Sequence, residues 1–115
     1  MSQEDFATLM RHKDEYVVLL QKEAPKVARR LYELGVFQVI LFGSVAEGNA
    51  SIHSDLDLMV IWDTPLSKPE RTAFLYQKLG PVPVPVDLIV LTPAETVPER
   101  RTQFLNNIFH KGVRL

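Results

Sequence analysis

Two apolar segments of the chain set the strongest limits on its fold. Residues 36–42 (VFQVILF) and 55–62 (DLDLMVIW) are nearly continuous in apolar side chains, and residues 86–91 (VDLIVL) form a third such run. Runs of this length without polar alternation are typical of strands buried on both faces. Such strands need helices packed against the sheet, so the sequence predicts an α/β fold on a small mixed sheet.

Helical patterns flank these strands. Between residues 3 and 34, apolar side chains recur every seven residues, which places one apolar stripe along a helical surface. Pro25 interrupts the stripe, and proline suits the first turn of a helix but disrupts its interior. We therefore predict two helices, 3–22 and 25–34, with one kinked helix as the alternative. Further helices are predicted at 67–79 and 98–111, and a loop with one helical turn at 43–54.

Length and composition limit the classes of protein to which the chain can belong. Its 115 residues, 46% of them hydrophobic, suit a single domain, residues 1–115. A net charge of -1 excludes a strongly basic protein that coats nucleic acid. The lack of cysteine excludes disulfides and thiolate zinc sites, and it suits a cytoplasmic location. We recognise no signal peptide and no apolar stretch near the ~20 residues of a membrane span, so no membrane contact is expected.

The charges are distributed unevenly along the chain. Residues 35–63 contain four acids and no Lys or Arg. Either these acids are solvated at the ends of loops, or a group outside the side chains neutralises them, for which a metal ion is the obvious candidate. The four acids are Glu47, Asp55, Asp57 and Asp63.

Asp55 and Asp57 form the strongest candidate metal site. They lie two residues apart on a predicted strand, so their side chains point to the same face. Two carboxylates at one end of a buried strand repel each other unless a cation lies between them. Hard oxygen ligands suit Mg²⁺. Asp87 begins the third predicted strand, so three carboxylates converge if the two strands are neighbours.

Gly43 and Ser44, which follow the first strand directly, form a candidate phosphate loop that Gly48 closes. Glycine lets the backbone approach a ligand closely, and a turn into a helix offers free N–H groups to a phosphate. Alone, a Gly-Ser pair is usually a turn, and an Asp-x-Asp pair is usually two acids at the end of a loop. Together, in this order, they favour a site of phosphoryl transfer.

Residues 41–63 (LFGSVAEGNASIHSDLDLMVIWD) resemble the signature of the DNA polymerase beta-like nucleotidyltransferase superfamily. The whole chain resembles the minimal nucleotidyltransferases (MNT), many of which are antitoxin partners of helical HEPN-domain toxins. The resemblance implies a polymerase beta-like fold, ATP as substrate and two Mg²⁺ ions as cofactors. It assigns metal-binding and catalytic roles to Asp55, Asp57 and Asp87, and nucleotide-binding roles to Gly43, Ser44 and Gly48.

The same resemblance implies a reaction and a partner. The reaction is Mg²⁺-dependent transfer of AMP from ATP to a hydroxyl of a partner protein, with release of pyrophosphate. In the antitoxin branch the acceptor is a tyrosine of the toxin. The alternative is a binding subunit that neutralises its partner by contact. Glu47 favours that alternative, because the family commonly has arginine at this position and the exchange removes a cation near the phosphates.

The remaining candidates have plainer interpretations. A loop histidine such as His53 is usually solvated, and Trp62 at the end of a strand is usually part of the core. Arginines on amphipathic helices, Arg71 among them, are usually solvated, although they could contact a triphosphate or a partner. For an interface with a partner or a second copy, we expect the helix 3–22 and the apolar residues of the last helix, which are Phe104, Leu105, Ile108 and Phe109.

Overall fold

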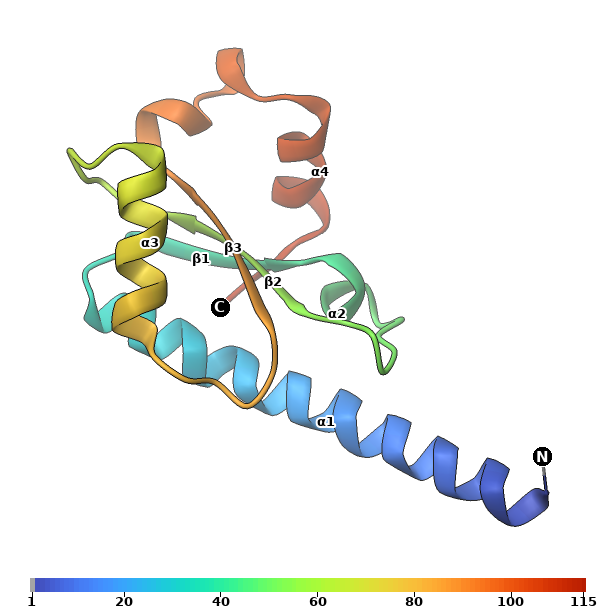
Figure 1. The fold of residues 1–115 in the computed structure, drawn as a ribbon. Coiled ribbons are helices and arrows are strands. Elements are labelled where there is room, and N and C mark those ends of the chain that lie inside the picture. Colours follow the sequence, from blue (N-terminus) through green and yellow to red (C-terminus); the bar gives the residue numbers. More distant parts are fainter. Residues whose placement is uncertain (1) are drawn as a thin grey trace.

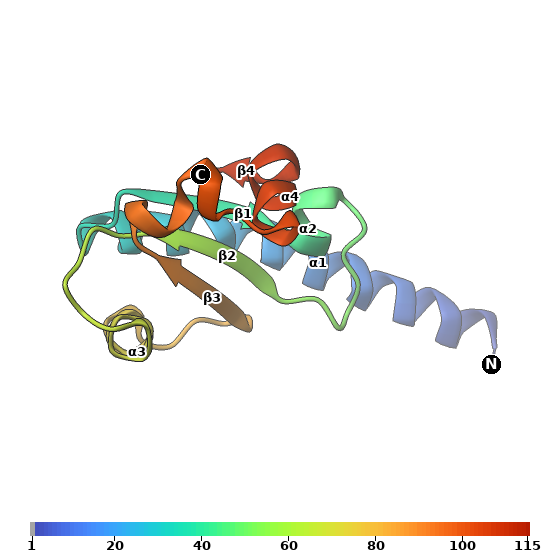
Figure 2. The same cartoon turned by 90° about the horizontal axis from the view of Figure 1, so that it is seen from above.

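A four-stranded sheet in the order β3-β2-β1-β4 forms the centre of the structure, a computed structural model that describes residues 2–115 (Figures 1 and 2). β1 runs antiparallel to β2 and to β4, whereas β2 and β3 are parallel. The predicted mixed sheet and its three strands are confirmed, and a fourth, very short strand was not predicted. The strands are β1 Gln38–Phe42, β2 Leu56–Ile61, β3 Val86–Leu91 and β4 Val113–Arg114.

Helices cover both faces of the sheet. α1 and α3 pack on one face, and α4 packs on the other over β1 and β2 (Figure 2). α2 is a single short helix directly after β1, as predicted for this loop. The helices are α1 Gln3–Glu33, α2 Gly43–Glu47, α3 Lys68–Leu79 and α4 Gln103–Lys111. Each helix within residues 2–115 lacks the length or the apolar character that crossing a bilayer requires.

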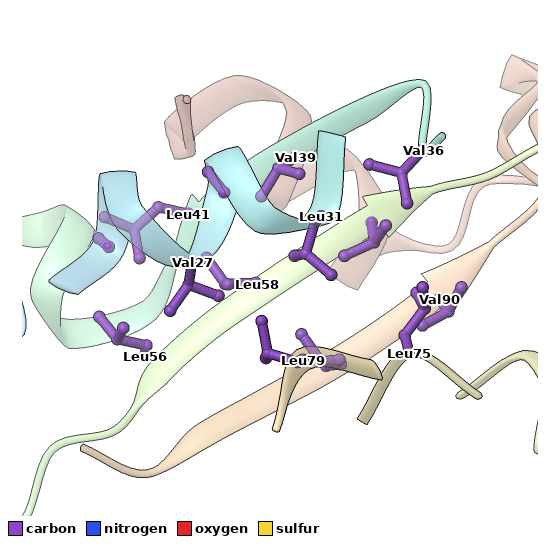
Figure 3. Packing of buried hydrophobic residues seen from close by; sticks show 14 of the residues in the cluster. Val27, Leu31, Val36, Val39, Leu41, Leu56, Leu58, Leu75, Leu79 and Val90 are labelled. Atoms are coloured by element: carbon purple, nitrogen blue, oxygen red, sulfur yellow. The ribbon is translucent and has the colours of Figure 1, made fainter. Parts of the chain in front are cut away.

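The main core lies between the sheet and the pair α1 and α3. Leu20 and Leu31 of α1 and Leu75 of α3 are fully buried. They belong to one cluster with Leu58 and Val60 of β2. Figure 3 shows Leu31, Leu58 and Leu75 among the aliphatic side chains gathered between the two helices and the strands. Complete burial of each such side chain stabilises the fold by about 1.5–3 kcal/mol.

The prediction of two helices before β1 is wrong, because α1 continues through Pro25. A proline at this position removes the N–H that would bond the carbonyl of Gln21. Both Pro25 and Gln21 are exposed, so water can bond this carbonyl. The buried side chains of Ala24 and Val27 keep the two halves of the helix packed on one surface.

The last helix is shorter than predicted. Instead of one helix over 98–111, the chain forms two 3-10 turns, Pro93–Thr96 and Pro98–Arg100, before α4 begins. Thr102 caps α4 by accepting a hydrogen bond from the backbone N–H of Leu105 at 3.2 Å. Each proline begins a turn, where its fixed φ fits and its missing N–H costs nothing.

Arg71 of α3 is buried, and its interpretation as a solvated side chain is therefore wrong. Its Nε donates to the carbonyl of Val90 at 3.2 Å, and its guanidinium pairs with Glu95 at 2.6 Å. Burial alone would raise the pKa of Glu95, but hydrogen bonds from Thr92 and the charge and hydrogen bond of Arg71 hold it below its ordinary value. Arg71 thus joins α3, β3 and the turn that follows β3.

Tyr76 of α3 forms hydrogen bonds with the backbone of the same strand, β3. The Tyr76 hydroxyl donates to the carbonyl of Val86 at 3.2 Å and accepts from the N–H of Leu88 at 2.7 Å. In a parallel pair the backbone groups of alternate residues point away from the partner strand. Tyr76 and Arg71 therefore satisfy backbone groups on the outer side of β3.

Replacing Arg71 with methionine should destabilise the protein by about 2 kcal/mol more than replacing Arg29 in the same way. The methionine side chain leaves the Val90 carbonyl without its side-chain donor and removes the positive charge beside Glu95, whereas Arg29 lies on the exposed side of α1. Urea unfolding at neutral pH measures both free energies. Equal losses in the two variants would show that the ion pair adds nothing to stability.

Candidate active site

Asp57 and Asp87 lie side by side where β2 and β3 begin. The parallel register pairs Asp57 with Asp87, and then Met59 with Ile89. Residues in register on parallel strands share a face, and Met59 and Ile89 belong to the cluster on the α4 side of the sheet. Asp55 precedes Asp57 by two residues, just before β2. The sheet topology thus brings two of the predicted carboxylates together, and the chain order adds the third.

The electrostatics of this group centre on Asp57. Burial raises its pKa first, and the negative charges of Asp87 and then Asp55 raise it further. Asp57 is partly buried, whereas Asp55 and Asp87 are exposed. The segment 35–63, which supplies two of the three acids, has no Lys or Arg to offset these charges. The mutual repulsion expected from the sequence is therefore present at the site.

Gly43 lies against the carboxylate of Asp57. β1 ends at Phe42, which is the register partner of Asp57, so the next residue passes directly over that side chain. A Cβ atom at Gly43 would overlap Oδ2 of Asp57 and would lie 3.2 Å from its Cγ. Gly43 also has φ +76°, which side chains rarely adopt. Only glycine therefore lets the backbone enter α2 so close to this carboxylate.

Ser44 takes part in a hydrogen-bond network around Ser54. The Ser44 hydroxyl donates to the Ser54 hydroxyl at 2.8 Å, and the N–H of Ser51 donates to the same oxygen at 2.8 Å. The Tyr16 hydroxyl donates to the Ser54 carbonyl at 2.7 Å. Ser54 is buried. The network joins α1, α2 and the loop that leads into Asp55.

Sequence reasoning missed Ser54 and Tyr16 as residues that shape the site. The one available signal for Ser54 is its position immediately before Asp55. The periodicity of the first helix does not distinguish Tyr16 from its apolar neighbours. The hydrogen bond from Tyr16 to Ser54 joins residues 38 positions apart, so no local pattern predicts it. The hydrogen bonds of Ser54 with Tyr16 and Ser44 therefore depend on the tertiary packing of α1 and α2 around this loop.

The other two loop candidates are more exposed. Gly48 ends α2 in the left-handed conformation, with φ +79°, and a Cβ atom there would meet nothing within 4 Å. His53 is exposed, as expected for a solvated loop histidine. The structure therefore places Gly48 at the far end of α2, whereas Gly43 lies beside the carboxylates.

The donor chemistry of the acid group fits a divalent cation. Three carboxylates offer hard oxygen ligands. Burial raises the pKa of Asp57 first, and the negative charges of Asp87 and Asp55, which a cation would offset, raise it further. Within residues 2–115, however, no three Asp, Glu or His side chains stand close enough together to hold an ion without moving. Asp55, Asp57 and Asp87 are the residues that would hold such a cation.

Comparisons with known proteins agree with this geometry. The family model described as "Nucleotidyltransferase domain" matches residues 22–109, which is well over half of the chain. The fold is similar to that of a protein from Sulfolobus solfataricus described as a putative nucleotidyltransferase. The TM-score is 0.61 and the identity 20%, over 87% of this chain and 82% of that one. At this identity the likeness concerns the fold alone. No curated protein matched the sequence.

Gly43→Ala should cost more stability than Gly48→Ala. Both variants place a side chain at nearly the same positive φ, which costs about 1–2 kcal/mol. Only Gly43→Ala adds an overlap with Asp57, which should cost a further ~1–3 kcal/mol. Urea unfolding measures the difference, and adding Asp57→Ala should remove it. If the two glycine variants lose the same free energy, the close approach of Gly43 to Asp57 is refuted.

Asp57→Asn should stabilise the protein at pH 7. Because folding raises the pKa of Asp57 above its ordinary 3.8, the folded state binds more protons than the unfolded state between the two values. The stability of the unmodified protein therefore falls as the pH rises through that window, and asparagine removes this loss. Unfolding free energies should differ at pH 7 and converge below the ordinary pKa. Asp63→Asn, beyond the opposite end of β2, serves as the control and should show no such convergence.

Proposed function

This chain belongs to the nucleotidyltransferase domain family and has the polymerase beta-like fold predicted from its sequence, and on that basis we propose that it transfers AMP from ATP to a hydroxyl group. Membership of the family indicates nucleotidyl transfer in general. The choice of ATP, the requirement for Mg²⁺ and the nature of the acceptor are parts of the proposal. The observation that carries it is the pair Asp57 and Asp87, in register beside the glycine that begins α2.

Each predicted site residue has a role in the proposed reaction. When bound, Mg²⁺ would neutralise phosphate charge and lower the pKa of the acceptor hydroxyl. Asp55, Asp57 and Asp87 would hold the ion, and Asp87 would also accept the proton of the acceptor hydroxyl. The acceptor oxygen bonds to the α-phosphorus, the bond from that phosphorus to the bridging oxygen breaks, and pyrophosphate leaves. Gly43 and Ser44 position the outer phosphates, for which the Ser44 hydroxyl turns away from Ser54.

We propose that the acceptor hydroxyl belongs to a partner protein, a helical toxin of the HEPN type. The first half of α1 extends away from the sheet, so that the molecule measures 55 × 30 × 20 Å (Figure 1). Four large apolar side chains on this half are exposed to solvent. Exposed apolar side chains that share one side of a helix are a common mark of a protein interface, and Phe6 lies three residues from Leu9 and four from Met10. The four residues are Phe6, Leu9, Met10 and Val18.

The structure narrows the interface that was expected on the last helix. Ile108 is buried, and Leu105 and Phe109 pack against the cluster on that face of the sheet. They serve the protein's own core and are not free for a partner. Phe104 remains 54% exposed, beside Phe42 in an edge-to-face contact. Our proposed partner surface is therefore the first half of α1 together with Phe104.

A second candidate function is neutralisation of the partner by contact alone. Glu47, exposed at the end of α2, adds a negative charge next to the loop that would receive phosphates. The three aspartate side chains also require movement before they enclose a cation. Both observations favour a binding subunit, and the following experiment separates the two functions.

Incubation with ATP, Mg²⁺ and the helical protein encoded by a neighbouring reading frame should add one AMP to that protein, detected by intact-mass spectrometry. Asp57→Asn should reduce the rate at least about 100-fold, because it removes charge from the site of transfer. Asp63→Asn is the matched control and should retain activity. An inhibited but unmodified partner would favour contact alone. Transfer that survives Asp57→Asn would place the chemistry elsewhere.

A further inference from the structure

Binding of a phosphate tail poses a charge problem for the candidate site. Three aspartates lie at the strand ends, and residues 35–63 contain no Lys or Arg. A nucleoside triphosphate brings more negative charge to the same place. A divalent cation would offset part of this charge. A basic side chain close to the loop at Gly43 would offset more of it.

We propose that Lys111, the last residue of α4, is this basic side chain and binds the phosphate tail of the nucleotide. The assignment rests on the proposed function and adds a binding residue to it. A hollow of about 310 Å³ lies between α2 and α4, and both Gly43 and Lys111 line it. Gly43 is also the residue that touches Asp57. The hollow thus joins Lys111 to the glycine that lies against Asp57.

The lining of this hollow makes Lys111 its source of positive charge. Among the lining residues, Glu47 and Lys111 are the two with charged side chains. Neither belongs to the ion pairs found within residues 2–115, which join Lys26 to Glu23 and Arg71 to Glu95. Lys111 is exposed and can therefore turn its ammonium group toward a ligand. The rest of the lining consists of apolar side chains, Phe42 and Phe104 among them, together with Asn107 and two glycines.

The backbone that carries Lys111 is fixed on both sides. One turn earlier, Ile108 is buried against the sheet. The following residue, Gly112, crosses β1 so closely that a Cβ atom would lie 2.5 Å from both the Ile108 carbonyl and Ile40 Cγ2. Val113 then pairs with Leu41 in the sheet. A flexible basic side chain thus begins from a rigid point at the edge of the hollow.

Two arginines of the second half of the chain, Arg101 and Arg71, are already engaged, and Arg114 of β4 does not line the hollow. Arg101 lies over the ring of Phe109, 3.9 Å from its centroid, and donates from Nε to the Thr96 carbonyl at 2.6 Å. Arg71 is buried with Glu95. Moving either side chain into the hollow would sacrifice these contacts, whereas Lys111 gives up no ion pair within the described residues 2–115. Among these basic residues, Lys111 is therefore the best candidate to bind a phosphate in the hollow.

Calorimetric titration of ATP and of adenosine, with Mg²⁺ and without any acceptor, tests the assignment on the full chain. Lys111→Met should weaken ATP binding roughly 10-fold, the loss expected when a hydrogen bond to a charged group is removed, and should leave adenosine binding unchanged. Lys111→Arg should retain most of the affinity for ATP. Arg114→Met, three residues on and outside the hollow, is the matched control and should bind ATP as the unmodified protein does.

The outcomes separate this assignment from the proposed function. If Lys111→Met binds ATP normally, or loses ATP and adenosine equally, Lys111 is not the phosphate ligand, and the proposed function stands. If the unmodified protein binds no ATP, both proposals fall. Thermal unfolding of each variant confirms that a loss of affinity is not a loss of fold, because Lys111 is exposed and its removal should leave the melting temperature unchanged.

Discussion

The parallel pairing of β2 with β3 holds two like charges next to each other. Asp57 and Asp87 repel, and the repulsion is overcome on the opposite face of the same strands. There, Leu58 and Val90 are buried beneath α1 and α3, and hydrophobic burial provides free energy that the charges cannot reverse. The core thus imposes a local electrostatic cost at one end of the sheet. This arrangement is typical of functional sites, where local stability is sacrificed for chemistry.

The backbone after β1 completes the arrangement. Gly43 meets the Asp57 carboxylate, and Ser44 is tied through Ser54 to the loop that carries Asp55. A shift of α2 would therefore move both the loop that contains Ser54 and the carboxylate of Asp57. The Gly43–Ser44 turn and the acid group, which are separate signals in the sequence, form one connected unit in the structure.

The strands and most helices were predictable because their signals are local: continuous apolar runs, seven-residue spacing and caps. The errors have equally specific causes. α1 continues through Pro25 because this proline lies on the exposed side of the helix. Sequence spacing alone does not show that the carbonyl of Gln21 is accessible to solvent. Burial of Arg71 depends on Glu95, 24 residues further along. β4 has only two residues, too few for a pattern. Within the site, the aspartates and Gly43 were recognisable from their order, whereas the hydrogen bonds of Ser54 arise only from tertiary packing.

Side chains of α3 cover part of the open edge of β3, which limits how two molecules can associate through their sheets. Sheets commonly aggregate by adding a strand from another molecule to an open edge. Here Tyr76 occupies the N–H of Leu88 and the carbonyl of Val86, and Arg71 occupies the carbonyl of Val90. An incoming strand would have to displace a phenol and a guanidinium before it could pair along the whole of β3. Side chains of one helix therefore protect this edge of the sheet against polymerisation.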